Sequence, residues 1–232
     1  MSLLTPSTGM LQSKLSTLCR GTNARSWPAR WAVRTAARNR MCPGSWQRGR
    51  PARLDRRAIP MLVSKSKDLH KYGTGVIVGP TTILTANHVA ADKMDVVLPR
   101  AAVKGRAVCR ARNQDLAVVK APLPRGTPYY SVSSKTPSVG ETVWVGGYPE
   151  RKWKVARRRV RYIISSATLG GRVVKSPMIV FRPALHKGAS GAPVLNRRGQ
   201  VVGIFVAANN QSNYSIAFPT TVALKTCRKF LN

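Results

Sequence analysis

From residue 61 onward, short apolar runs alternate with turns made of Gly, Pro, Asn and Asp. The runs have the length and the β-branched composition of β-strands. The candidate strands occupy residues 61–65, 73–79, 82–86, 94–99, 106–111, 115–121, 141–148, 160–169, 172–175, 178–183, 192–196, 200–208 and 214–218. Short strands separated by turns predict an all-β barrel or sandwich.

The prolines of residues 122–128 mark a linker inside this β region. The linker divides the strands into two groups of similar size. We therefore predict two six-stranded antiparallel β-barrels, the first formed by residues 60–124 and the second by residues 125–232.

One short helix is predicted after Pro219. Thr220 or Thr221 can cap its N-terminus, and apolar residues recur at helical spacing as far as Phe230. Basic residues in the last turn suit the helix dipole. This helix should pack as a closing C-terminal helix.

Residues 1–59 lack the hydrophobic periodicity of a packed element and predict a disordered basic N-terminal arm. Residues 1–57 carry 12 basic side chains and 1 acidic side chain. Residues 1–54 contain no acidic residue but several serines and many arginines, which is also typical of an organelle transit peptide, and a start at Met61 is a further alternative. No apolar run is long enough to cross a bilayer, so no transmembrane segment is expected.

The net charge of +33 is the unusual feature of the composition. Such a charge attracts polyanions by counterion release, so non-specific RNA is a candidate partner. No RNA-recognition motif, KH loop or zinc knuckle predicts base readout. The four cysteines show no paired spacing, which predicts neither a disulfide framework nor a zinc site and favours a reducing compartment.

Three residues carry candidate chemistry. His88 ends a strand in LTANHVA, Asp115 opens the strand DLAVVKA, and Ser190 lies in the turn GASGAP. Taken singly, they also fit a packed histidine, a turn residue and a small polar residue. A serine that hydrolyses an amide needs an imidazole to take its proton and a carboxylate to orient that imidazole. With three histidines and seven acidic residues in the chain, few combinations are available.

The glycines around Ser190 permit a second feature of such a site. Gly188 and Gly191 allow positive φ. The backbone amides of Gly188 and Ser190 could then turn toward one point and form an oxyanion hole.

In order and spacing, TANHV, DLAVVK and GASGAPV resemble the three catalytic signatures of the trypsin-like (chymotrypsin-fold) serine proteases. They follow that family's His, Asp, Ser order with gaps of 27 and 75 residues. The resemblance covers about residues 61–231, and VGETVWVGGYP is similar to the HtrA-type branch. The spacing is also similar to that of sobemovirus-type and polerovirus-type polyprotein proteases.

The resemblance implies a chymotrypsin-like fold in which His88 is the general base, Asp115 orients it and Ser190 is the nucleophile. It implies a serine endopeptidase that needs no cofactor and no metal. Ala189 stands where many secreted members have an Asp that binds a newly formed N-terminus. We therefore expect the chain to fold directly into its active form.

The resemblance also places five residues around the primary specificity pocket: Ala184, His186, Phe205, Ala207 and Ala208. None of them is acidic, which disfavours cleavage after Lys or Arg. A small or medium apolar side chain before the scissile bond is expected. Glu or Gln is the alternative, because His186 and Lys187 precede the oxyanion turn.

Residues 150–161 form the densest basic segment. Its candidate contacts to nucleic acid or to an acidic substrate are Arg151, Lys152, Trp153, Lys154, Arg157, Arg158, Arg159 and Arg161. Lys and Arg could neutralise phosphates while Trp153 stacks a base, or the segment could be a solvated hairpin.

The preferred function is a viral polyprotein-processing protease in the cytoplasm of an infected cell, with a polypeptide, including its own flanks, as substrate. One alternative is an RNA-binding, capsid-like protein on a protease scaffold, by analogy with alphavirus capsids. Another is an HtrA-type quality-control protease imported into an organelle. The sequence sets no oligomeric state.

Overall fold

The computed structural model describes residues 54–66 and 69–231. The basic arm predicted for residues 1–59 therefore lies outside the described residues up to residue 53 and stays a prediction. The transit-peptide alternative lies outside them for the same reason.

The folded region begins before residue 60, where the prediction placed its boundary. A short 3-10 helix, η2 (Arg56–Ala58), precedes the first strand. Ile59 is fully buried, and the backbone amide of Asp55 donates to the hydroxyl of Tyr130 over 2.6 Å. A chain that started at Met61 would lose this buried isoleucine.

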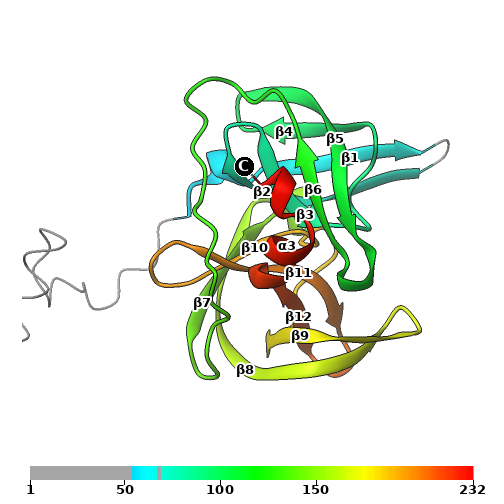
Figure 1. Cartoon of the computed structure of the whole chain (residues 1–232), viewed down its shortest axis with the longest axis vertical. Helices are drawn as coiled ribbons and strands as arrows, with labels where there is room; N and C mark the ends of the chain where they lie inside the picture. The colour runs from blue at the N-terminus through cyan, green and yellow to red at the C-terminus, as the bar shows by residue number, and fades with distance from the viewer. Residues whose placement is uncertain (1–53, 67–68, 232) are drawn as a thin grey trace, which may run out of the picture. The chain divides into compact units, whose positions relative to one another are not determined.

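Six antiparallel strands close into the first barrel (Figure 1). Their order around the barrel is β1-β2-β3-β6-β5-β4, and β4 pairs with β1. They are β1 (Met61–Ser66), β2 (Leu69–Gly79), β3 (Thr82–Ala86), β4 (Met94–Leu98), β5 (Ala101–Ala111) and β6 (Leu116–Lys120).

Six further strands form the second barrel, so the predicted all-β two-barrel fold is confirmed. Their order is β10-β11-β12-β9-β8-β7, with β10 paired to β7. They are β7 (Thr142–Gly147), β8 (Lys154–Leu169), β9 (Arg172–Arg182), β10 (Pro193–Leu195), β11 (Val201–Asn209) and β12 (Tyr214–Pro219). The proline-rich linker runs between β6 and β7.

Two of the predicted strands, residues 172–175 and 178–183, form the single strand β9. A register shift opposite β8 accommodates Ser176 and Pro177, because Ile164 pairs with Met178 and Ser166 pairs with Lys175. Proline cannot donate to a ladder and is tolerated at such a bulge. The break that the sequence analysis placed between these two strands is therefore a bulge within one strand.

The predicted C-terminal helix is present as α3 (Thr220–Thr226), followed by the 3-10 helix η5 (Arg228–Phe230). The predicted threonine cap is wrong. Pro219 occupies the N-cap, and Thr220 Oγ1 instead donates to the carbonyl of Ser133 over 2.8 Å. No helix of the described residues is long and apolar enough to cross a membrane.

Two buried clusters make the core. One fills the first barrel and continues into β11, β12 and α3, and the other fills the second barrel. The largest side chains with almost no exposure include Phe181, Phe218, Ile59, Leu62 and Leu116. Apolar burial at about 25 cal/mol per Å² makes these clusters the main source of stability.

A disulfide joins Cys109 in β5 to Cys227 at the end of α3, with their Cα atoms 5.9 Å apart. The prediction of no disulfide is therefore wrong, and the argument for a reducing compartment loses its premise, since disulfides persist in oxidising compartments. The two residues are 118 positions apart, so only the fold brings them together.

Replacing both cysteines, Cys109→Ser with Cys227→Ser, should lower the free energy of unfolding by about 2–5 kcal/mol, because the bond closes a long loop. Chemical denaturation followed by circular dichroism measures the change. A reducing agent should destabilise the wild type by a similar amount and leave the double variant unchanged. Equal stability of the two proteins under oxidising conditions would contradict the expectation.

Candidate active site

His88 and Asp115 are in direct contact. The backbone amide of His88 donates to Asp115 Oδ1 over 2.9 Å, and His88 Nδ1 lies 2.6 Å from Asp115 Oδ2. An ionised carboxylate only accepts hydrogen bonds, so Nδ1 carries the proton and Nε2 of the neutral ring is free to accept one. The His88 side chain is 48% exposed, so this second nitrogen is open to a reactant.

Neighbouring strands bring these two residues together. β3 ends at Ala86 and β6 begins at Leu116, and these two residues are paired in the ladder. The chain therefore leaves β3 and enters β6 at the same point, although β4 and β5 intervene in sequence. Asp115 precedes β6 in the left-handed region, with φ 49°, which turns its side chain back toward the turn after β3.

Ser190 lies in a turn whose flanking glycines have the backbone predicted for them. Gly188 has φ +96° and Gly191 has φ +86°. A side chain at Gly73 would lie 2.6 Å from Val89 Cγ2 and 2.9 Å from the Ser190 carbonyl oxygen. Val89, which follows His88 in the first barrel, and Ser190 of the second barrel thus both lie against Gly73 of β2.

Among the described residues, no hydrogen bond joins the side chains of Ser190 and His88. Such bonds are often long in substrate-free enzymes and shorten when substrate binds. The amides of Gly188 and Ser190 donate to no backbone acceptor within the described residues, whereas the intervening Ala189 amide donates to the His186 carbonyl over 3.2 Å. Two donors of this turn are thus available to a ligand oxygen.

Thr74 of β2 holds this turn and was missed by the sequence analysis. Its side chain is fully buried. Its amide donates to the Ser190 carbonyl over 2.7 Å, and its hydroxyl donates to the Gly188 carbonyl over 3.0 Å. The same hydroxyl accepts from the amide of Tyr148 in the second barrel over 3.0 Å. Sequence offered no signal, because a threonine between two glycines of a strand reads as an ordinary strand residue.

The five predicted specificity residues lie in different surroundings. Phe205 is 2% exposed, its ring centre lies 6.4 Å from that of Phe181, and it packs in the core of the second barrel, so its place in a specificity pocket stays a prediction. A bulge in β11 between Phe205 and Ala207 changes which side chains face outward. Val206 therefore joins Ala207 in a pocket beside His88.

Ala184, His186 and Ala208 do not line that pocket. Ala184 is half-buried, and its amide donates to Asn213 Oδ1 over 2.9 Å. His186 is exposed in the loop before Gly188, and Ala208 is exposed in β11 opposite Ser215.

The basic segment of residues 150–161 also divides. The guanidinium of Arg151 lies 4.6 Å from the Tyr72 ring centre, and the amide of Glu150 donates to the Lys187 carbonyl over 2.9 Å. The short helix η4 (Pro149–Arg151) therefore lies against the loop before Gly188. Lys152 and Lys154 are exposed, and Lys154 is 3.7 Å from Glu150.

Two members of the segment are not placed as predicted. Trp153 is half-buried with its ring centre 5.4 Å from that of Tyr148, so this packing occupies the ring that was expected to stack a base. Arg158 lies on the inner side of β8 between the exposed Arg157 and Arg159, as strand alternation requires. Burial lowers the pKa of the Arg158 guanidinium, and its Nε has no hydrogen-bond partner among the described residues.

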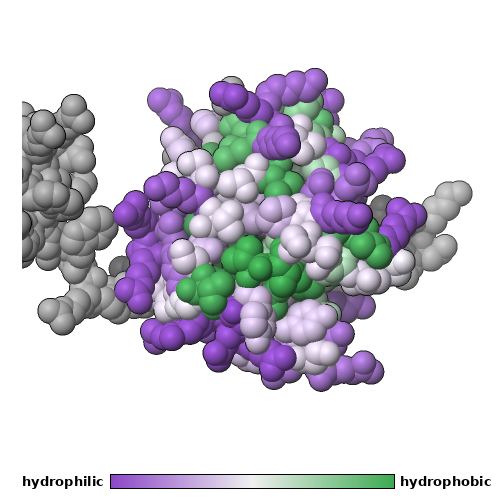
Figure 2. Space-filling model, turned by 60° about the horizontal axis from the view of Figure 1, so that its bottom comes forward, coloured by the Kyte–Doolittle hydropathy of each residue, from purple (hydrophilic) through white to green (hydrophobic). Residues whose placement is uncertain are grey.

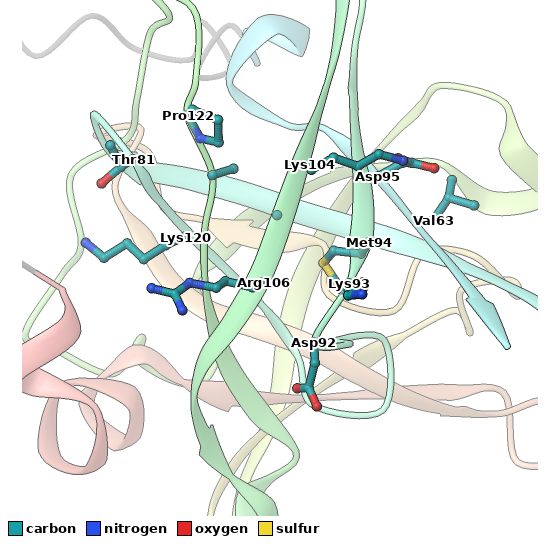
Figure 3. A pocket seen from close by; sticks show the side chains of 12 residues that line it. Val63, Thr81, Asp92, Lys93, Met94, Asp95, Lys104, Arg106, Lys120 and Pro122 are labelled. Atoms are coloured by element: carbon teal, nitrogen blue, oxygen red, sulfur yellow. The ribbon is translucent and has the colours of Figure 1, made fainter.

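Two pockets lie on different parts of the molecule. A pocket of about 670 Å³ contains His88 and Asp115. A larger one, of about 1030 Å³, lies on the first barrel and contains none of the predicted site residues (Figure 3). Its two acids are already paired, Asp95 with Lys104 and Asp92 with Arg110. The larger pocket therefore lacks the groups that hydrolysis would need.

Comparison with known proteins was made on sequence and on structure. Residues 73–204 match the family model of the trypsin-like peptidase domain. The chain is 27% identical over 186 residues to a probable periplasmic serine endoprotease DegP-like of Ectopseudomonas mendocina (strain ymp). This match covers 73% of the chain and 38% of that relative, so the chain spans less than half of the relative's length.

Solved structures share the fold. The active form of the Rv3671c protease from M. tuberculosis has a TM-score of 0.69 at 20% identity, covering 75% of this chain and 81% of that one. The HtrA-type protease AlgW with tripeptide has a TM-score of 0.66 at 23% identity, covering 76% and 61%. Likeness at these identities establishes the chymotrypsin-like fold.

Thr74→Val should reduce kcat/KM and the free energy of unfolding together, because it removes the hydroxyl between the Gly188 carbonyl and the Tyr148 amide. Leaving buried polar groups without partners costs about 1–3 kcal/mol. Denaturation and the rate of active-serine labelling measure the two effects. Thr74→Ser keeps the hydroxyl and should retain most of the kcat/KM and most of the free energy of unfolding. Equal losses in the two variants would argue against a role for the Thr74 hydroxyl in holding the turn.

Proposed function

The chain belongs to the trypsin-like peptidase family, whose members are serine endopeptidases, and on this premise we propose that it hydrolyses peptide bonds with Ser190 as nucleophile. His88 is the general base and Asp115 orients it. The observation that carries the proposal is the double hydrogen bond from His88 to Asp115.

This double bond fixes both the position and the tautomer of the imidazole. Asp115 holds the backbone of residue 88 through one carboxylate oxygen and the ring through the other. With Nδ1 protonated, only Nε2 can take a proton from a hydroxyl. The carboxylate also stabilises the imidazolium that forms when the proton arrives.

The reaction then follows from the groups present. Ser190 Oγ attacks the substrate carbonyl carbon while its proton moves to His88 Nε2. The amides of Gly188 and Ser190 bind the resulting oxyanion. The imidazolium gives the proton to the leaving amine, the C–N bond breaks, and water hydrolyses the acyl-enzyme by the same steps.

The oxyanion turn is held without an ion pair to a new N-terminus. Ala189, which stands at the position of the acid used by many secreted members, is buried, and its hydrogen bonds among the described residues are two backbone ones, to His186 and Ala192. Thr74 instead fixes the carbonyls of Gly188 and Ser190. The proposed enzyme is therefore active as folded.

The finer proposal is that the substrate is a viral polyprotein, cleaved in the cytoplasm of an infected cell. Its support is the spacing of His88, Asp115 and Ser190, which is similar to that of the sobemovirus and polerovirus type. The DegP-like match favours instead an HtrA-type quality-control role, with organelle import as one route. N-terminal sequencing of the native protein separates them, because an intact N-terminus excludes removal of a transit peptide.

A second candidate function, binding of single-stranded RNA, rests on the outer face of β8. Arg157, Arg159 and Arg161 are exposed there, and Arg159 lies directly opposite Arg182 of β9. Like charges placed opposite each other are unfavourable unless an anion binds between them. None of these arginines has an ion pair among the described residues.

An exposed aromatic side chain accompanies these arginines. Tyr162 is 60% exposed and follows Arg161, so it takes the base-stacking role in this proposal in place of Trp153. Figure 2 looks toward the lower end of the molecule in Figure 1, and there hydrophobic residues gather within a rim of hydrophilic ones. Single-stranded nucleic acid binds surfaces that combine cations with stacking platforms.

A fluorophosphonate probe tests the nucleophile. The wild-type protein should be labelled, and Ser190→Ala should not be. Asp115→Asn should slow labelling by roughly 10⁴-fold, because it leaves the imidazole in the wrong tautomer. Circular dichroism should show that both variants are folded. A folded wild type that resists the probe would overturn Ser190 as nucleophile and favour a binding role on a protease scaffold.

The RNA proposal predicts a change in salt dependence. Each phosphate contact on a single strand contributes about −0.7 to the slope of log K against log salt. Replacing Arg157, Arg159 and Arg161 by Gln should therefore weaken the slope by about 2, measured by fluorescence anisotropy with a labelled RNA. The control variant replaces the exposed Arg100, Arg125 and Arg197 by Gln. The same change in both variants would show diffuse attraction without a β8 site.

A further inference from the structure

The pocket beside His88 has walls from three separate elements. One wall is the 3-10 helix η3 (Arg112–Gln114) between β5 and β6, another is the end of the β8–β9 hairpin, and the third is Val206 with Ala207 of β11. In Figure 1 the loop between β5 and β6 extends toward this hairpin. The hairpin therefore borders the same pocket as His88 and Asp115, although Ser190 is not among the residues that line it.

Basic side chains outnumber acidic ones in this pocket. Arg112, Arg172 and Lys175 line it and are exposed. None of them forms an ion pair with any residue that the structure describes. The single acid in the lining is Asp115, and both of its carboxylate oxygens are bonded to His88. The pocket thus offers three free cations close to the reacting group.

The β8–β9 hairpin places Arg172 and Lys175 in β9, just after a two-residue turn. Leu169 pairs with Arg172, and the two residues between them, Gly170 and Gly171, have φ of +55° and +77°. Such values are those of a tight type I′ turn, whose twist suits a two-residue hairpin. The backbone position of Arg172 is therefore fixed by its pairing with Leu169.

Besides the polar Asn113 and Gln114, the lining has an apolar part. Leu169, Val173, Val174, Val206 and Ala207 supply it. This combination suits a side chain with a hydrocarbon stem and a terminal carboxylate, since Arg forms paired hydrogen bonds with carboxylates. A basic side chain would be repelled there.

We propose that this pocket selects peptide substrates with an acidic residue close to the scissile bond, bound by Arg112, Arg172 and Lys175. The inference rests on the proposed peptidase activity, because the occupant is identified as the peptide from its position against His88. These residues are distinct from the basic segment of residues 150–161, and the sequence analysis did not single them out.

The experiment begins with the full chain and a proteome-derived peptide library, whose cleaved members are sequenced by mass spectrometry. From one cleaved sequence, matched quenched fluorescent peptides are made with Glu or Gln at each position near the cut. At one or more positions, the peptide with Glu should have a kcat/KM about fivefold higher than the peptide with Gln. This is the scale of a solvent-exposed ion pair.

Variants assign the preference to the pocket. Arg112→Gln, Arg172→Gln and Lys175→Gln together should bring the Glu to Gln ratio of kcat/KM close to one. The charge-matched control, with Arg100, Arg125 and Arg197 replaced by Gln, should keep the wild-type ratio. A preference that survives in the pocket variant would overturn the inference, and so would its equal loss in the control.

The outcomes separate this inference from the proposed function. No cleavage and no probe labelling would overturn both. Labelling and cleavage without a Glu preference at any position would overturn only the pocket's selectivity. If single-stranded RNA competes with the peptide, and only in proteins that keep the three cations, while Glu and Gln peptides react alike, then RNA is the occupant and the inference is wrong.

Discussion

The hydrogen bonds of one buried threonine hold the parts of the site together. Thr74 belongs to the first barrel, yet it binds the carbonyls of Gly188 and Ser190 and the amide of Tyr148, all in the second. Its own carbonyl accepts from Thr85 Oγ1 over 2.7 Å, which ties it to β3, the strand that leads to His88. In this way both barrels share one set of buried polar contacts.

The packing around Thr74 explains why glycine is needed nearby. A side chain on Gly191 would lie 1.9 Å from the Thr74 carbonyl oxygen, a separation that no real contact allows. The positive φ of Gly191 is also one that other residues avoid. Only glycine therefore fits at position 191. The turn positions the backbone around Ser190 before any substrate arrives.

Local patterns were sufficient to predict the two barrels and the three candidate catalytic residues, because strands, turns and glycine-rich loops are short-range features. Contacts between distant segments could not be predicted. The partners Cys109 and Cys227 meet only through the packing of α3 against the barrels. In β11 every residue near Phe205 is apolar, so nothing in the sequence marked the bulge that turns Val206 toward His88. Net charge, likewise, does not show which arginines share a surface.

The bond between Cys109 and Cys227 gives the chain a covalent ring. The ring includes Asp115, Ser190 and all six strands of the second barrel, and it leaves out His88. A single backbone cut inside the ring would produce two pieces that remain linked by the sulfur atoms. A cut within this region would therefore not separate Ser190 from His88, and a nicked molecule would gain only the mass of one water until its disulfide was reduced.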